Sequence, residues 1–320
     1  MITGLRALIQ RQLHRIGNGL GIGALREQVM EAKLLAARVL INQMKNRRVL
    51  DSIHEAEFKV FSQFGDDGII QYLMHHVGVS PDEQVFIEFG VENYEEANTR
   101  FLLVNNNWRG LIIDGSPSNM ADVRGSGYFW KHELTAASAF VDRENINELF
   151  RKNGVEGKIG LLSIDIDGND YWVWDRIEVV NPLVVVVEYN SVFGAQHPVT
   201  IPYDPAFRRA KAHYSNLYWG SSLKALWLLG QRKGYGFVGC NSAGNNAYFV
   251  RRDRLGPLKE LTVEEGYVES KFRESRNSSW KLTYLNGDER LQAIAGMVVF
   301  DVERDRLATL AELYQLGGCS

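Results

Sequence analysis

The segment "KIGLLSIDIDGNDYWVWDRIEVVNPLVVVVEYN", residues 158–190, is the part of the sequence that most directly indicates the fold. An apolar run leads into several acids, a stretch with helical spacing follows near 170–178, and the segment closes on a second apolar run. That second run, from Leu183 to Val187, shows no alternation of apolar and polar side chains, so it predicts a strand buried on both faces. The segment therefore predicts a strand, a helix and a second, parallel strand.

The same alternation continues on both sides of this segment. Runs rich in β-branched residues predict strands at 85–91, 110–116, 157–167 and 182–190, with a weaker candidate near 134–141. Helices are expected between them, near 66–77, 95–106, 117–124, 143–153 and 170–178. Further on, 234–241 and 246–253 are separated only by "SAGN", which predicts an antiparallel hairpin. The expected fold is an α/β sheet of mostly parallel strands that ends in an antiparallel strand.

Composition excludes several classes of protein. The 320 residues are 45% hydrophobic and 23% charged, as in a soluble globular protein, and the net charge of −3 gives no indication of a nucleic-acid partner. Two cysteines, Cys240 and Cys319, argue against a disulfide framework. No apolar run is long enough to span a membrane, and the N-terminus does not resemble a signal peptide. We therefore expect a cytoplasmic protein.

Residues 1–50 form a distinct basic segment, with nine Lys or Arg against two acids. Apolar residues from Leu5 to Ile16 recur at helical spacing, the glycines of "GNGLGIG" (17–23) interrupt the pattern, and a second helix is expected from about Ala24 to Met44. A basic amphipathic arm can bind the anionic inner face of a membrane. It can equally pack on its own domain or on a partner subunit, which leaves a homo-oligomer open.

Polar residues gather where the predicted strands end. Because the carboxyl ends of parallel strands meet at one edge of a sheet, these side chains are expected to surround one site. They are Glu88 and Gly90 after the first strand, Asp114 and Ser116 after the second, Asp165 and Asp167 after the fourth, and Glu188 and Asn190 after the fifth.

The first strand is followed by "EFGVENYEEANT" (88–99), which has a single glycine, Gly90. A dinucleotide-binding turn needs G-x-G-x-x-G, and the acids in this loop would repel phosphates. S-adenosylmethionine carries positive charge and no phosphate, so it suits this loop better.

Four motifs, "VFIEFGVENYEEANT", "GLIIDGSPSNM", "LLSIDIDGNDYWVW" and "VVVVEYN", give residues 58–252 a resemblance to class I S-adenosylmethionine-dependent methyltransferases. Within them the chain is similar to FkbM-like O-methyltransferases. The resemblance implies a Rossmann-like seven-stranded sheet with an antiparallel last strand, after an N-terminal helical arm. It also implies a catalytic domain at 51–255 with an acceptor lid at 191–222, and a C-terminal extension at 256–320 packed on that domain.

The resemblance also implies roles for individual residues. Glu88 and Gly90 would open the cofactor loop, and Asp114 would hold both ribose hydroxyls, with Ser116 beside it. The family's second and third loop glycines are Glu92 and Tyr94 here, so other groups must bind the methionine part of the cofactor. Polar residues available for that part are Gln63, Asp66, Asn98 and Thr99.

The acids of "DIDGND" (165–170) have several interpretations. Some related sugar methyltransferases bind magnesium with an acid in the place of Asp165 and acids after strand five, where Glu188 and Asn190 stand here, so a magnesium site is one expectation. A D-x-D glycosyltransferase is an alternative, with Asp165 and Asp167 as metal ligands. In a purely structural interpretation, Asp170 begins the next helix. His197 and His213 are the candidate general bases.

The aromatic-rich segment 191–222 suits sugar rings, whose C–H faces stack on aromatic side chains. We therefore expect an S-adenosylmethionine-dependent O-methyltransferase with a carbohydrate acceptor, from a surface glycan or a glycosylated natural product. A catalytically inactive methyltransferase-like scaffold, bound to a membrane surface through residues 1–50, is the second alternative.

Overall fold

The computed structural model describes residues 22–46 and 49–316, which fall into two compact units, 1–48 and 49–320. The first unit contains helix α2 (Ile22–Lys45), which matches the helix expected from about Ala24 to Met44. The helix expected near residues 5–16 lies outside the described residues. No helix in the described parts of the chain is long and apolar enough to cross a membrane.

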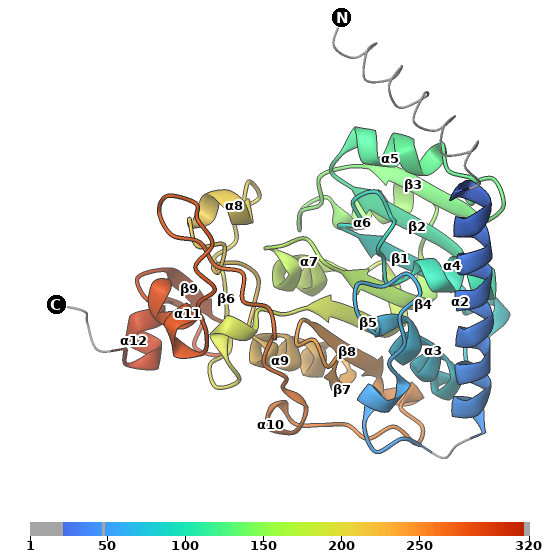
Figure 1. The fold of residues 1–320 in the computed structure, drawn as a ribbon. Coiled ribbons are helices and arrows are strands. Elements are labelled where there is room, and N and C mark those ends of the chain that lie inside the picture. The colour runs from blue at the N-terminus through green and yellow to red at the C-terminus, as the bar shows by residue number, and fades with distance from the viewer. Residues whose placement is uncertain (1–21, 47–48, 317–320) are drawn as a thin grey trace, which may run out of the picture. The chain divides into compact units, whose positions relative to one another are not determined.

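The second unit is built around a seven-stranded sheet with the order β3-β2-β1-β4-β5-β8-β7 (Figure 1). Within this sheet β8 runs opposite to the other six strands; it lies between β5 and β7 and pairs with both in antiparallel fashion. The strands are β1 (Val85–Phe89), β2 (Arg109–Asp114), β3 (Leu134–Ser138), β4 (Gly157–Ile164), β5 (Val180–Glu188), β7 (Tyr235–Cys240) and β8 (Asn246–Arg251). This order and the antiparallel last strand confirm the Rossmann-like methyltransferase fold class expected from the sequence.

The helices between the strands mostly lie where the sequence predicts them. They are α3 (Asp66–Val77), α4 (Arg100–Asn106), α5 (Pro117–Arg124), α6 (Ile146–Lys152) and α7 (Asp170–Arg176). The expected helix at 95–106 begins only at Arg100, because the buried Glu88 carboxylate accepts the backbone N–H groups of Asn98 and Thr99 and holds them in a loop. The next helix, α9 (Leu223–Lys233), was not predicted.

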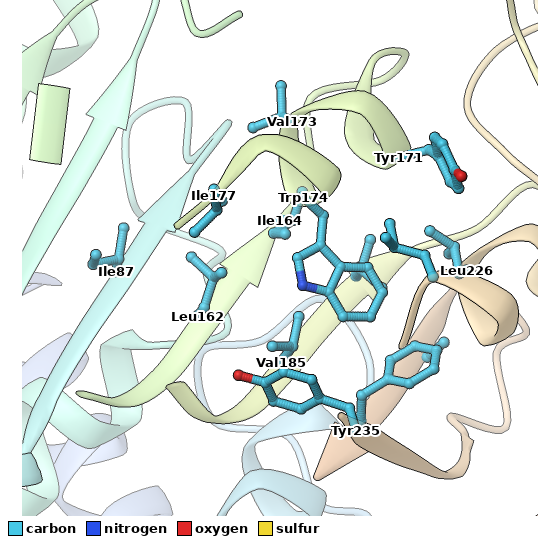
Figure 2. Packing of buried hydrophobic residues seen from close by; sticks show 14 of the residues in the cluster. Ile87, Leu162, Ile164, Tyr171, Val173, Trp174, Ile177, Val185, Leu226 and Tyr235 are labelled. Atoms are coloured by element: carbon cyan, nitrogen blue, oxygen red, sulfur yellow. The ribbon is translucent and has the colours of Figure 1, made fainter. Parts of the chain in front are cut away.

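The main hydrophobic core lies between the sheet and α6, α7 and α9. Trp174 of α7 is almost fully buried and contacts the rings of Tyr235 and Phe249, at centroid distances of 6.2 and 5.0 Å. Figure 2 shows its indole among Leu162 of β4, Val185 of β5 and Leu226 of α9. This packing fixes α7, and with it the loop between β4 and α7, at the carboxyl end of the sheet.

A second, smaller sheet has the order β10-β9-β6, with β6 (Val199–Thr200), β9 (Val298–Asp301) and β10 (Arg306–Thr309). Through it the C-terminal extension pairs with the segment that follows β5. A separate hydrophobic core, which includes Phe193, Ile201, Leu217, Val299 and Leu310, supports this sheet. Three short helices join these parts: α8 (Arg209–Ala212), α11 (Asp288–Ala293) and α12 (Leu310–Tyr314). The sequence did not predict this sheet.

Candidate functional site

A cleft of about 640 Å³ opens at the carboxyl ends of β1, β2, β4 and β5. It brings together nine of the site residues predicted from the sequence, which are Gln63, Glu88, Gly90, Asn98, Asp114, Ser116, Asp165, Asp167 and Glu188. The cleft is strongly acidic, because seven of its lining residues are acids and two are arginines. Such a cleft favours a positively charged ligand over one that carries phosphates.

Gly90 directly follows β1, and at this point the backbone lies against the backbone that follows β4. Its φ is +80°, and a Cβ atom there would lie 1.5 Å from the backbone oxygen of Asp165, so no side chain fits. Glu92 and Tyr94 stand where the resemblance led us to expect glycines, and both take positive φ angles, 48° and 60°. The loop therefore keeps a glycine-like backbone path without the glycines.

Glu88 holds the loop that follows β1 in place. Its carboxylate accepts hydrogen bonds from the N–H groups of Asn98 (2.9 Å) and Thr99 (3.0 Å) and from the Thr99 hydroxyl (2.6 Å). Burial raises the pKa of Glu88, and these donors counteract the shift. Thr99 is fully buried and its hydroxyl also bonds the Tyr94 hydroxyl. Thr99 therefore supports the loop, whereas from the sequence we expected it to face the cleft. Asn98 does line the cleft.

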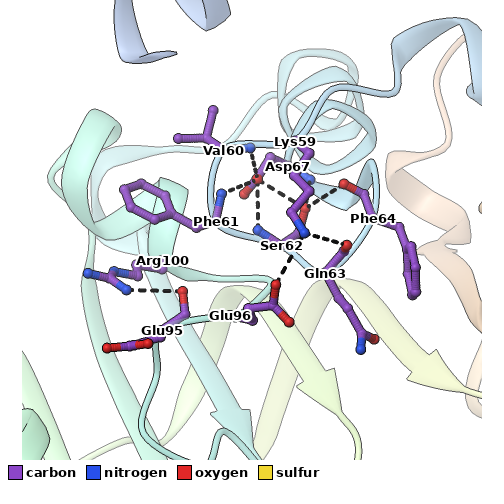
Figure 3. Close-up of polar contacts among 10 residues, drawn as sticks. All are labelled: Lys59, Val60, Phe61, Ser62, Gln63, Phe64, Asp67, Glu95, Glu96 and Arg100. Carbon is purple, nitrogen blue, oxygen red and sulfur yellow. Dashed lines mark hydrogen bonds and ion pairs between the residues drawn. The ribbon is translucent and has the colours of Figure 1, made fainter. Parts of the chain in front are cut away.

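Gln63 reaches the cleft from a loop that Asp67 holds in place (Figure 3). One oxygen of the Asp67 carboxylate accepts three consecutive backbone N–H groups, those of Val60 (2.7 Å), Phe61 (2.7 Å) and Ser62 (2.8 Å). The Ser62 hydroxyl donates to the same oxygen at 3.0 Å. This carboxylate fills a ready-made anion site and so fixes the loop that carries Gln63.

Asp66, the residue before Asp67, has its hydrogen-bond partners in the β7–β8 hairpin. Its carboxylate is fully buried and accepts hydrogen bonds from Asn241, Asn246 and Tyr248, at 2.9, 2.9 and 2.5 Å. Asp66 therefore ties α3 to the β7–β8 hairpin, and it is not among the residues that line the cleft, where we expected it.

Asp114 ends β2 at the rim of the cleft. Its carboxylate accepts the N–H groups of Glu92 (2.9 Å) and Ser116 (2.8 Å), which aim it across the loop after β1. Carboxylate oxygens accept more than one hydrogen bond each, so the group can still accept from a vicinal diol. Ser116 caps α5 through its hydroxyl, which accepts from the N–H of Asn119 at 3.3 Å. The donors and acceptors at this rim fit a ribose.

Asp165 and Glu188 form a carboxyl pair on the floor of the cleft, where β4 and β5 end side by side. Both side chains line the cleft, and one oxygen of Glu188 is buried without a hydrogen-bond partner. Burial, followed by repulsion from neighbouring acids, raises the pKa of both groups well above the usual range. The pair therefore tends to hold a proton that the two carboxyls share.

The other two acids of "DIDGND" have different surroundings. Asp170 is fully buried at the start of α7 and accepts the N–H groups of Ile166 (2.8 Å) and Gly168 (2.9 Å). Burial raises its pKa to about 6. Asp167 is exposed, has a φ of +54° and pairs with Arg209 at 2.7 Å. Asp170 thus shapes the loop that presents Asp165.

The expected magnesium site loses its third protein ligand. The amide nitrogen of Asn190 donates to the backbone oxygens of Leu217 and Trp219, and its oxygen accepts from the N–H of Val192. Asn190 therefore holds the chain after β5 and has no oxygen directed at Asp165 and Glu188. No cluster of three or more His, Cys, Asp or Glu that could hold a metal occurs within residues 22–46 and 49–316.

Neither candidate histidine lines the cleft. His197 stacks edge-on against Tyr314, and His213 bonds the Ser215 hydroxyl at 2.7 Å and contacts Tyr214. Burial lowers the pKa of both histidines. The ionisable groups that line the cleft at the ends of β4 and β5 are instead the carboxyls of Asp165 and Glu188.

A second pocket of about 200 Å³ adjoins the cleft. The residues common to both cavities are Gln63, Glu188, Arg209 and Asn245. Its walls come from the segment after β5, including Trp219, and from the C-terminal part of the chain, including Phe272 and Arg290. Glu188 therefore stands where a large acidic cleft meets a small mixed pocket.

Several lining residues were not predicted as site residues. Asn245 and Asn246 enter from the β7–β8 hairpin, Phe140 follows β3, and Arg208 and Arg209 belong to the expected lid. The hairpin asparagines carried a usable signal, since the turn "NSAGNN" (241–246) ends at the carboxyl edge of the sheet. The arginines gave no such signal, because only the tertiary fold brings α8 to the cleft.

The sequence matches no protein-family model and has no significant match among curated proteins. The fold has likenesses among solved structures. The N-terminal domain of EvdMO1 with SAH bound matches with a TM-score of 0.39 and 10% identity, over 70% of this chain and 94% of that one. The same domain in the presence of SAH and D-fucose gives 0.36 and 10%, over 70% and 94%.

An O-methyltransferase from Bacillus cereus in complex with SAH gives a TM-score of 0.38 and 11% identity, over 70% of this chain and 90% of that one. Identities and TM-scores at this level say nothing about what the chain binds. The strand order and the residues of the two cavities carry that information.

Proposed function

We propose that the protein is an S-adenosylmethionine-dependent O-methyltransferase that acts on a carbohydrate. One observation carries the proposal: an acidic cleft at the carboxyl ends of a methyltransferase-type sheet meets a smaller pocket at a half-buried carboxyl pair, Asp165 and Glu188. When bound, S-adenosylmethionine supplies a methyl group on a positively charged sulfur. Seven acids around the cleft favour that charge.

The cofactor would be held by residues at the ends of β1 and β2. Asp114 would accept both ribose hydroxyls, with Ser116 beside it, and Gly90 leaves the backbone accessible where the loop leaves β1. Asn98 and Gln63 supply polar groups for the amino-acid end. This assignment follows the lining of the cleft and omits Thr99, which is buried.

Asp165 and Glu188 would accept the proton that the acceptor hydroxyl releases. A carboxyl pair that shares one proton still carries one negative charge, so it can accept a second proton from the substrate. The pair also lies at the junction of the two cavities, where acceptor and cofactor would meet. Trp219 and Phe272 offer aromatic faces for a sugar ring in the second pocket.

The D-x-D glycosyltransferase is disfavoured by the same geometry. Asp167 is exposed and bound to Arg209 at 2.7 Å, whereas Asp165 lines the cleft beside the end of β5, so the two carboxylates of the motif have different surroundings. The acids around the cleft would also repel the diphosphate of a sugar nucleotide.

The test combines binding with product analysis. Calorimetry should detect S-adenosylmethionine and S-adenosylhomocysteine binding but no UDP-sugar binding. Glycans incubated with isotope-labelled cofactor should gain a labelled methyl group by mass spectrometry. Glu188→Gln should lower that rate by about a hundredfold or more, as for loss of a proton acceptor, whereas Glu148→Gln on the exposed face of α6 should not change it. Binding of UDP-sugar alone would refute the proposal.

A further inference from the structure

The second pocket contains two arginines, although a neutral sugar needs none. Arg209 and Arg290 both line it, one from α8 and the other from α11. Arginine presents several N–H donors in one plane, an arrangement that matches the oxygens of carboxylates and phosphates. The surroundings of each arginine indicate what the pocket binds.

Arg290 is a buried cation with an incomplete set of partners. It is only 5% exposed. Its guanidinium donates to the backbone oxygen of Phe272 at 3.1 Å and to Glu269 at 2.7 Å. Its Nε atom is buried and has no hydrogen-bond partner. Buried donors in folded proteins are almost always satisfied, so an unsatisfied one beside a pocket suggests that a ligand changes its surroundings.

Arg209 stands at the boundary of the two cavities. Its guanidinium lies 4.5 Å from the centroid of the Trp219 ring, and it is held by the backbone oxygen of Asn216 (3.0 Å) and by Asp167 (2.7 Å). Those bonds use Nε and Nη1. No protein group in the described part of the chain bonds its Nη2. The planar group is thus held in place and retains donors for an anion.

Each arginine of this pocket is already paired with an acid, Arg209 with Asp167 and Arg290 with Glu269, both at 2.7 Å. Glu274 accepts from Asn216 at 3.3 Å and pairs with Arg276 at 3.2 Å, so its charge is already matched. Burial, and then repulsion from Asp165, raises the pKa of Glu188 well above its usual range. An anion in this pocket would therefore bind through the donors that these ion pairs leave open in the described part of the chain, Nη2 of Arg209 and Nε of Arg290.

We propose that the acceptor is an anionic sugar, whose carboxylate or phosphate group binds Arg209 and Arg290 while one of its hydroxyls faces Glu188. Trp219 and Phe272 contact the ring. This inference rests on the proposed function, because it takes the second pocket as the acceptor site. It narrows the substrate class from carbohydrates in general to uronates and sugar phosphates.

The test measures binding of small sugars to the full chain saturated with S-adenosylhomocysteine. The probes are D-glucuronate, D-glucose 6-phosphate and neutral D-glucose, titrated by calorimetry at constant ionic strength. An acidic probe should bind about tenfold to a hundredfold more tightly than glucose, as expected for one charge-assisted interaction. The two acidic probes distinguish a carboxylate from a phosphate ligand.

Variants then assign the preference to the two arginines. Arg209→Met and Arg290→Met keep the apolar stem and remove the charge, and each should reduce the preference for the acidic probe about tenfold or more. Lys281→Met removes a positive charge from an exposed position outside the pocket and should leave it unchanged. Arg290 is buried, so Arg290→Met is the more demanding substitution for folding. If that variant does not fold, the comparison of Arg209→Met with the unaltered protein still tests whether the preference for the acidic probe depends on the pocket.

The outcomes separate the two proposals. If S-adenosylhomocysteine binds but acidic and neutral sugars bind equally, or no acidic sugar binds at millimolar concentration, the anionic acceptor is refuted and the methyltransferase stands. If S-adenosylhomocysteine does not bind while glucuronate is preferred and the preference depends on Arg209, the methyltransferase is refuted and the anion site stands.

Discussion

Asp170 makes a measurable prediction about stability and pH. Burial raises its pKa from an ordinary value of 3.8 to about 6 in the folded protein. Below pH 4 the group is protonated in both states. Between pH 4 and 6 the folded protein holds a proton that the unfolded chain has released, so the free energy of unfolding falls as the pH rises. The contribution of Asp170 to stability is therefore present in acid and lost above pH 6.

The size of this effect follows from the shift. A difference of roughly two pKa units is worth about 3 kcal/mol, at about 1.4 kcal/mol per unit. Asp170→Asn cannot ionise, so it removes this pH dependence. It also replaces one of the oxygens that accept from Ile166 and Gly168, which costs about 1–3 kcal/mol at every pH. We expect the variant to be clearly less stable than the parent at pH 4.5 and to approach it at pH 7.

Urea unfolding followed by tryptophan fluorescence, at intervals between pH 4.5 and 7.5, measures the difference between the two proteins. Loss of the Asp170 charge also relieves repulsion at Asp165 and Glu188. This relief stabilises the variant more at pH 7 than at pH 4.5, so it adds to the expected convergence of the two stabilities. Glu148→Gln, at an exposed carboxyl on α6, is the matched control and should follow the parent. A difference between Asp170→Asn and parent that stays constant within about 0.5 kcal/mol would refute the reasoning.

Three further predictions concern the cleft. Asp114→Ala should weaken S-adenosylhomocysteine binding by about 2–4 kcal/mol in calorimetry, whereas Ser118→Ala should not, and equal affinities would remove Asp114 from the ribose role. Asp67→Ala leaves three buried N–H groups without an acceptor and should lower the free energy of unfolding in urea by about 3 kcal/mol or more, so a change below about 1 kcal/mol would contradict the role assigned to that carboxylate. Methyl transfer should survive exhaustive chelation, because a proton can neutralise the Asp165–Glu188 pair; activity lost on chelation and restored by magnesium would show that a cation does so instead.

The strands and most helices could be predicted because each depends on a local pattern. The buried run from Leu183 to Val187 and the hairpin around "SAGN" were enough to give the sheet and its antiparallel strand. The rim acids could be predicted for the same reason, since strand ends meet at one edge.

The errors came from side chains whose partners lie far away in the sequence. Thr99 supports the loop because its hydroxyl donates to Glu88, eleven residues away in the sequence. Asn190 is bound through its amide to the backbone oxygens of Leu217 and Trp219. His197 and His213 have suitable chemistry, but their neighbours are known only from the fold. Local sequence indicates which residue types are present at a site, whereas long-range packing decides their roles.

The small β10-β9-β6 sheet has a consequence for how such proteins could diversify. The core beneath it takes Phe193, Ile201 and Leu217 from one stretch of the chain and Val299 and Leu310 from another, and it is separate from the core around Trp174. If only one stretch were transplanted into another protein, its apolar side chains would lack the partners that the other stretch supplies and would be exposed to solvent. Recombination could exchange the wall of the second pocket between homologous proteins only if it moved both stretches together. The seven-stranded sheet would remain intact through such an exchange, whereas the cleft would change at Phe207, Arg208 and Arg209, which belong to the first stretch.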